Sequence, residues 1–248
     1  MHIRRNLKEI LDKKHQELQE LRGMPMRRGK RKTKALILEA EKHSYSMEVA
    51  RPKKRRKSGR LMRKRKTEIS EAWNILSGGL EREGFTEEII KKTNYLIVPE
   101  LYPGRETAFY RDHNVRNVSS DPILPPRFEK VPALMQEFIL KLNEYDNRED
   151  FHPVEVAALA HLVLAYIHPF QDGNGRTARM LQNVYLDLYE FPVPIIRPEE
   201  KQPYQSVLKM GMRSWRGEEE WGIPNFLNYI AVKVNESLDD LLKNRIIS

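Results

Sequence analysis

The segment from Pro153 to Tyr166 is apolar on nearly every face of the helix that its spacing predicts. A helix with this pattern is stable when other helices surround it, so the segment predicts the centre of a helical domain. It leads directly into His168 and a glycine-rich turn, after which residues 176–188 predict a second helix. His161 interrupts the apolar run, and we expect a core histidine there rather than a metal ligand.

The rest of the chain has helical spacing with short breaks. Further helices are predicted over residues 3–21, 33–50, 67–80, from Thr86 onward, 131–145, 201–215 and 221–246. Residues 106–111 and 115–118 are expected to pair as a β-hairpin, and the four prolines in residues 121–132 indicate a connecting loop. The expected fold class is therefore all-α with one short β-hairpin.

The net charge of +9 comes from one segment, because residues 51–66 contain 11 lysines or arginines and no acidic residue. Without this segment, 33 basic residues stand against 35 acidic ones. Pro52 and Ser58-Gly59 favour a mobile loop over residues 51–66, at the end of an N-terminal helical region, residues 1–66, that precedes a domain of residues 67–248. Such a loop attracts nucleic acid or an acidic protein surface, and a solvated insertion or a nuclear-import string is the alternative.

The chain has no cysteine, which excludes disulfides and thiolate metal sites and is compatible with the cytoplasmic location that we expect. Residues 1–21 are charged throughout and do not resemble a secretory signal. The longest apolar run, residues 157–167, is shorter than the roughly 20 residues that cross a bilayer, so no membrane association is expected.

The twelve residues that start at His168 combine several groups suited to phosphate chemistry (His-Pro-Phe-Gln-Asp-Gly-Asn-Gly-Arg-Thr-Ala-Arg). Glycines at a helix start let an anion approach backbone N–H groups, and a histidine beside a phosphate suggests proton transfer. Asp172 is either a hard oxygen ligand for Mg²⁺ or a turn aspartate. Arg176 and Arg179 are three residues apart on one helix face, which suits them to phosphate oxygens.

This stretch resembles the motif of the Fic family, His-x-Phe-x-Asp/Glu-Gly-Asn-Gly-Arg-x-x-Arg, at every fixed position. The resemblance, which covers about residues 33–230, implies a mainly helical Fic fold and transfer of AMP from ATP, with Mg²⁺, to a Ser, Thr or Tyr hydroxyl of a target protein. It makes His168 the general base and Asp172 the metal ligand. The resemblance and the helix spacing together give a nucleotide-binding set: Phe170, Gly173, Asn174, Gly175, Arg176, Arg179 and Asn183. Gly175 favours AMP transfer, because kinase-like members carry lysine there.

The predicted hairpin corresponds to the flap with which Fic proteins hold a target segment by adding a strand to it. The candidate docking residues in this flap are Thr107, Tyr110 and Arg111. A surface hairpin without a docking role is the alternative.

Ser44 and Glu48 resemble the inhibitory pattern of the family, Ser/Thr-x-x-x-Glu-Gly/Asn, although Val49 departs from its last position. The resemblance implies that Glu48 pairs with Arg179, blocks productive binding of the γ-phosphate and can assist removal of AMP. A surface glutamate on the predicted helix 33–50 is the alternative. The same spacing also occurs elsewhere in the chain, at residues 67–71 and 214–218.

The leading hypothesis is therefore a Fic-type protein adenylyltransferase, with a homodimer as one candidate assembly. One alternative is a non-enzymatic module that binds nucleotide or nucleic acid through residues 51–66. Another is a Fic enzyme with a UDP-, GTP- or CDP-linked donor. The intact His168 and Arg179 favour catalysis, because binding alone requires no base.

Overall fold

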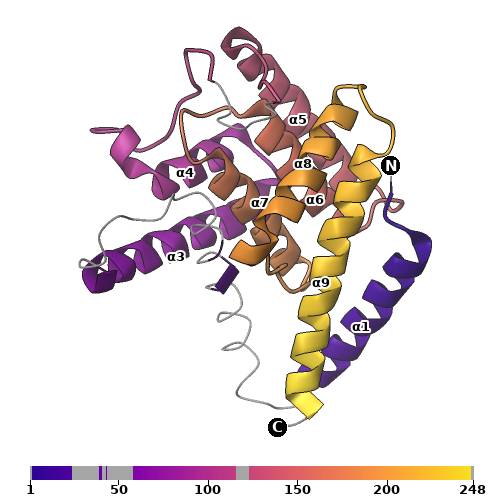
Figure 1. Cartoon of the computed structure of the whole chain (residues 1–248). Coiled ribbons are helices and arrows are strands. Elements are labelled where there is room, and N and C mark those ends of the chain that lie inside the picture. Colours follow the sequence, from indigo (N-terminus) through magenta and orange to yellow (C-terminus); the bar gives the residue numbers. More distant parts are fainter. Residues whose placement is uncertain (1, 24–38, 41–42, 44–57, 116–122, 247–248) are drawn as a thin grey trace.

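All the secondary structure in the described part of the chain is helical (Figure 1), which confirms the all-α fold. The computed structural model describes every residue except 1, 24–38, 41–42, 44–57, 116–122 and 247–248. Its helices are α1 (Arg5–Gly23), α3 (Ser58–Glu83), α4 (Glu87–Ile97), α5 (Val131–Asp146), α6 (Pro153–Ile167), α7 (Asn174–Leu188), α8 (Lys201–Trp215) and α9 (Gly222–Ile246). Three short 3-10 turns complete them: η1 (Pro99–Leu101), η2 (Phe128–Lys130) and η3 (Pro198–Glu200).

Helix α6 lies at the centre of the fold, as its sequence predicts. Every residue from Val154 to Leu164 is buried, and α5, α7, α8 and α9 all pack against α6. Helices α3 and α4 contact α7, while α1 lies along α9 (Figure 1). No helix in the described ranges is both long and apolar enough to span a membrane.

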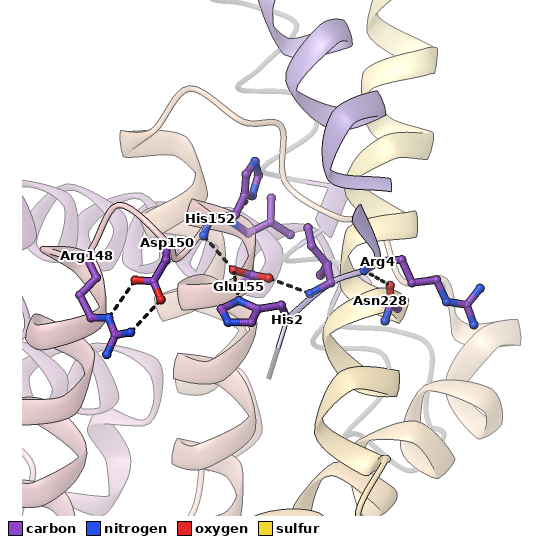
Figure 2. A network of polar contacts seen from close by, with 9 residues as sticks. His2, Arg4, Arg148, Asp150, His152, Glu155 and Asn228 are labelled. Carbon is purple, nitrogen blue, oxygen red and sulfur yellow. Dashed lines mark hydrogen bonds and ion pairs between the residues drawn. The ribbon is translucent and has the colours of Figure 1, made fainter. Parts of the chain in front are cut away.

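A buried carboxylate ties the N-terminal segment to the first turn of α6 (Figure 2). Glu155 is 1% exposed and accepts hydrogen bonds from the backbone amides of Ile3, at 2.7 Å, and His152, at 2.8 Å. Its Oε2 also lies 3.3 Å from Nδ1 of His2. The His152 ring reaches Asp12 of α1 through Nε2, at 2.9 Å. These contacts fix where α1 begins relative to the central helix.

The mobile loop predicted over residues 51–66 is wrong from Ser58 onward, because α3 begins there and continues to Glu83. Lysine and arginine have helix propensities close to that of alanine, so a basic run does not itself break a helix. The domain boundary expected between residues 66 and 67 therefore falls inside α3. Residues 51–57 and most of the predicted helix 33–50 lie outside the described residues.

The β-hairpin is not confirmed. Residues 106–115 form no strand, and residues 116–118 lie outside the described part of the chain. The described half is a loop that hydrogen bonds to other segments. The amide of Ala108 donates to the carbonyl of Lys91 at 3.4 Å, and the amide of Arg111 donates to that of Pro169 at 2.9 Å. These bonds tie the loop to α4 and to the turn after α6.

His161 is a core histidine, as expected, and it joins three helices. Its ring is fully buried between Gln182 of α7 and Tyr204 of α8, with Nδ1 and Nε2 each 2.8 Å from an oxygen of these residues. Burial, assisted by the positive charge of Arg179, lowers the pKa of His161 to about 3. The ring is therefore neutral, with one nitrogen donating and the other accepting.

We predict that acid destabilises the protein through His161. An unfolded chain takes up this proton near pH 6.5, whereas the folded protein takes it up only near pH 3, where the pKa lies. The contribution is therefore complete above about pH 6.5 and is lost progressively as the pH falls towards about 3. Denaturant unfolding from pH 7.5 to pH 4 measures it.

The variant His161→Gln should flatten this pH dependence and lower the stability at neutral pH by about 1–3 kcal/mol, because buried partners lose a hydrogen bond. The control is His113→Gln, since the side chain of His113 is 54% exposed. A pH dependence as steep in His161→Gln as in the wild type would contradict the prediction.

Candidate active site

The motif forms the loop between α6 and α7 and the first turns of α7. Helix α6 ends at Ile167, and His168 then adopts the left-handed conformation, with φ 51°, while its amide donates to the carbonyl of Leu164 at 3.0 Å. A non-glycine residue in this region stores about 1–3 kcal/mol of strain, so its surroundings must hold it there. His168 remains partly exposed, and its left-handed conformation turns the chain from α6 towards α7.

Asn174 closes the loop from its far side. It is 2% exposed, its Oδ1 accepts from the amide of Phe170 at 2.9 Å, and its Nδ2 donates to the carbonyl of Phe170 at 2.8 Å. Phe170 is fully buried and packs against the Tyr110 ring, with the ring centroids 5.9 Å apart. The side chains of these two expected nucleotide-binding residues therefore shape the turn.

Gly173 is required for its conformation and for its surroundings. Its φ is +78°, and a Cβ at this position would lie 2.9 Å from Asn94 Nδ2 and 3.2 Å from a methyl group of Val98. Both neighbours belong to the α4 side of the site, where α4 ends with Val98 as its C-cap. Only glycine fits this close approach without a shift of α4.

Asn94 holds the turn from α4, although sequence reasoning did not select it. The residue is fully buried; its Nδ2 donates to the Asp172 carbonyl at 3.0 Å and to Thr177 Oγ1 at 3.1 Å. Its Oδ1 accepts from the hydroxyl of Tyr102 at 2.6 Å. Burial and the negative charge of Asp172 raise the pKa of Tyr102 to about 12, so this hydroxyl stays a donor. An asparagine within a predicted helix was the only local signal.

The first turn of α7 offers an anion site. Gly173 is the N-cap, and no side chain caps the helix, so amides of this first turn face the loop. Gly175 lies in this turn and remains partly exposed. Backbone N–H groups in this arrangement bind phosphate oxygens.

Asp172 and Arg176 lie at the edge of this turn. Oδ1 of Asp172 accepts from the amide of Gly173 at 2.6 Å, and its Oδ2 lies 3.4 Å from Arg176. The Asp172 side chain is 65% exposed. No cluster of three or more metal-ligating side chains occurs among the described residues. One exposed carboxylate fits Mg²⁺ that keeps most of its waters and takes its remaining ligands from substrate phosphates.

Arg179 and Asn183 approach the site from inside the fold. Arg179 is 6% exposed, and its guanidinium lies 3.4 Å from the Tyr204 hydroxyl, which also contacts His161. Asn183 is 3% exposed and accepts from Gln182 at 3.1 Å. The two arginines of the motif therefore differ, because Arg176 lies near the rim whereas Arg179 is anchored in the core.

The motif residues thus lie in the loop after α6 and in the first turns of α7. The other candidates lie elsewhere. In the predicted flap, Thr107 is exposed, Tyr110 is half-buried and Arg111 is only 3% exposed. The side chain of Arg111 points into the structure, with Nε donating to the carbonyl of His168 at 2.8 Å. Ser44 and Glu48 lie outside the described residues.

Residues 84–186 match the Fic/DOC family, a range that includes α4 and the complete motif. The protein adenylyltransferase Fic of Nematostella vectensis is 33% identical over 165 residues, which cover 66% of this chain and 36% of that protein. The protein of the same name from Drosophila melanogaster is 38% identical over 116 residues, which cover 47% of this chain and 22% of that protein. The chain thus spans at most 36% of the length of these two relatives.

The fold is also similar to that of a solved Fic domain structure. The crystal structure of a Fic domain containing signaling protein from Bacteroides thetaiotaomicron superposes with a TM-score of 0.80 at 22% identity, and 97% of each chain is covered. This similarity extends the shared fold well beyond the residues that match the family. Residues 84–186, which contain the complete motif, therefore belong to the Fic/DOC family.

Proposed function

We propose that this protein is a protein adenylyltransferase, which transfers AMP from ATP to a hydroxyl side chain of a target protein. The observation that carries the proposal is the fixed loop between α6 and α7. This loop leads from a partly exposed histidine, His168, to the start of α7, which has no side-chain cap and carries the two arginines. The matched relatives named protein adenylyltransferase support this reaction class.

In this proposal His168 takes the proton from the target hydroxyl, and the resulting oxygen attacks the α-phosphorus of ATP while pyrophosphate leaves. The first-turn amides of α7 bind phosphate oxygens, and Arg176 and Arg179 balance the negative charge that develops on the leaving group. Mg²⁺ held by Asp172 and the nucleotide would neutralise part of the same charge.

Gly175 supports AMP transfer over transfer of the terminal phosphate, because the kinase-like members have lysine there. A different nucleotide donor would use the same residues. Wild-type protein that takes no label from α-³²P-ATP would point to such a donor. The basic residues in 51–66 motivate the second candidate, a module that binds nucleotide or nucleic acid, since a run of like charges attracts phosphate groups. That candidate requires no base at His168, so loss of function on replacing His168 separates the two.

The target protein would dock beside the loop that contains Thr107 and Tyr110, and Glu48 would inhibit by pairing with Arg179 or assist removal of AMP. The protein is proposed to act in the cytoplasm, with a homodimer as one assembly. None of these assignments is needed for the chemistry at His168.

We predict that His168→Ala lowers transfer of label from α-³²P-ATP to protein by roughly 10²- to 10⁴-fold, because the base is lost. Wild-type protein with γ-³²P-ATP is the control for phosphate transfer and should give no label. His2→Ala is the matched control variant, because His2 lies at the opposite end of α6, against Glu155. Undiminished labelling in His168→Ala would reject the assigned base.

We predict that Glu48→Gly raises the same labelling at least several-fold, since Arg179 then binds the γ-phosphate without competition. The matched control is Glu39→Gly, which places glycine in the same predicted helix. Equal labelling in both variants and in the wild type would reject inhibition by Glu48.

A further inference from the structure

Arg111 is a buried cation that binds backbone carbonyls of three separate segments. Its Nε donates to the carbonyl of His168 at 2.8 Å, one terminal nitrogen donates to that of His113 at 3.0 Å, and the other donates to that of Pro126 at 2.5 Å. Burial lowers the pKa of Arg111, although a guanidinium stays charged. Burying a charge is costly unless hydrogen bonds compensate it, so these three carbonyls belong to a specific arrangement.

The same residue holds the next carbonyl of the motif as well. The backbone amide of Arg111 donates to the carbonyl of Pro169 at 2.9 Å. Both carbonyls follow the end of α6, where the helix provides no amide to pair with them. Arg111 therefore fixes the orientation of two successive peptide planes, those that follow His168 and Pro169.

These contacts complete the restraint on His168. Its own amide is bonded to Leu164 at 3.0 Å, which holds the peptide plane before it, while Arg111 holds the plane after it. The orientations of these two peptide planes set φ and ψ of His168. They therefore also set the direction of its Cα–Cβ bond, along which the side chain leaves the backbone. The strained left-handed conformation of His168 is thus held from both sides.

We infer that Arg111 is a positioning residue for His168, which aims the base by holding its backbone and does not touch the substrate. This inference rests on the proposed function, in which His168 takes the proton of the target hydroxyl. The nucleotide side of the loop has separate supports, because Asn174 holds Phe170 and Asn94 holds the carbonyl of Asp172. Loss of Arg111 should therefore impair proton transfer while leaving nucleotide binding intact.

The expected signature is a reduction of kcat without a matching loss of ATP affinity. A misplacement of about 1 Å can cost roughly 10²-fold in rate, so Arg111→Ala should lower kcat by about 10- to 100-fold. The dissociation constant for ATP, measured by calorimetry, should stay within about twofold of the wild-type value, because the nucleotide side of the loop keeps its own supports. Arg111→Lys keeps the charge but lacks the rigid fork of donors. Its kcat should therefore lie between that of the wild type and that of Arg111→Ala.

The experiment compares label transfer from α-³²P-ATP for the wild type, Arg111→Ala, Arg111→Lys, His168→Ala and the double variant Arg111→Ala/His168→Ala. If Arg111 acts through His168, its removal costs nothing more once His168 is absent, which a double-mutant cycle detects. The control variant is Arg105→Ala, which removes a neighbouring arginine that lies 5.0 Å from the Phe109 ring. It should keep the wild-type kcat.

Three results would overturn the inference: an unchanged kcat, a loss of ATP affinity as large as the loss of rate, or an equal loss of rate with and without His168. If Arg111→Ala does not fold, the same three readings on Arg111→Lys decide. Transfer that depends on His168 but not on Arg111 overturns this inference alone. Absence of label in the wild type with any donor nucleotide overturns the proposed function and the inference together.

Discussion

The fold depends on the burial of α6 on all sides. An apolar helix of this kind is stable only inside a shell of other helices, and α5, α7, α8 and α9 form that shell. The same burial requires a partner for each polar group that α6 carries. Glu155 finds backbone amides at the first turn, and His161 finds Gln182 and Tyr204 in the middle. The bonds of Glu155 hold the N-terminal segment at the first turn of α6, and those of His161 hold α7 and α8 against its middle.

The loop after α6 gains its shape from distant segments rather than from its own sequence. Asn94 reaches it from α4, Arg111 reaches it from the loop after η1, and Asn174 closes it from the start of α7. Each supports a different part of the loop with hydrogen bonds from a side chain to backbone. A loop held in this way can keep a strained residue such as His168 in place, because relaxation would break bonds to rigid helices.

The second arginine of the motif, Arg179, is held by a chain of hydrogen bonds in the core. Arg179 contacts Tyr204, Tyr204 contacts His161, and His161 contacts Gln182, which in turn donates to Asn183. In the one consistent set of donors, the Tyr204 hydroxyl accepts from Arg179 and donates to the neutral ring of His161. The charge proposed to meet the nucleotide phosphates is thus supported by a buried polar chain rather than by the solvent.

The sequence by itself determined the helical class, most helix positions and the chemical content of the site. Periodicity reports which face of a segment is buried, and the motif is continuous in sequence, so its residues lie in one loop and the helix that follows it. The loop predicted over residues 51–66 was wrong from Ser58 onward, because lysine and arginine do not themselves break a helix. The roles of Asn94 and Arg111 were missed or assigned differently, because both depend on contacts between distant segments. Only the tertiary structure decided the roles of Asn94 and Arg111, because a side chain that bonds a backbone carbonyl many residues away leaves no local pattern.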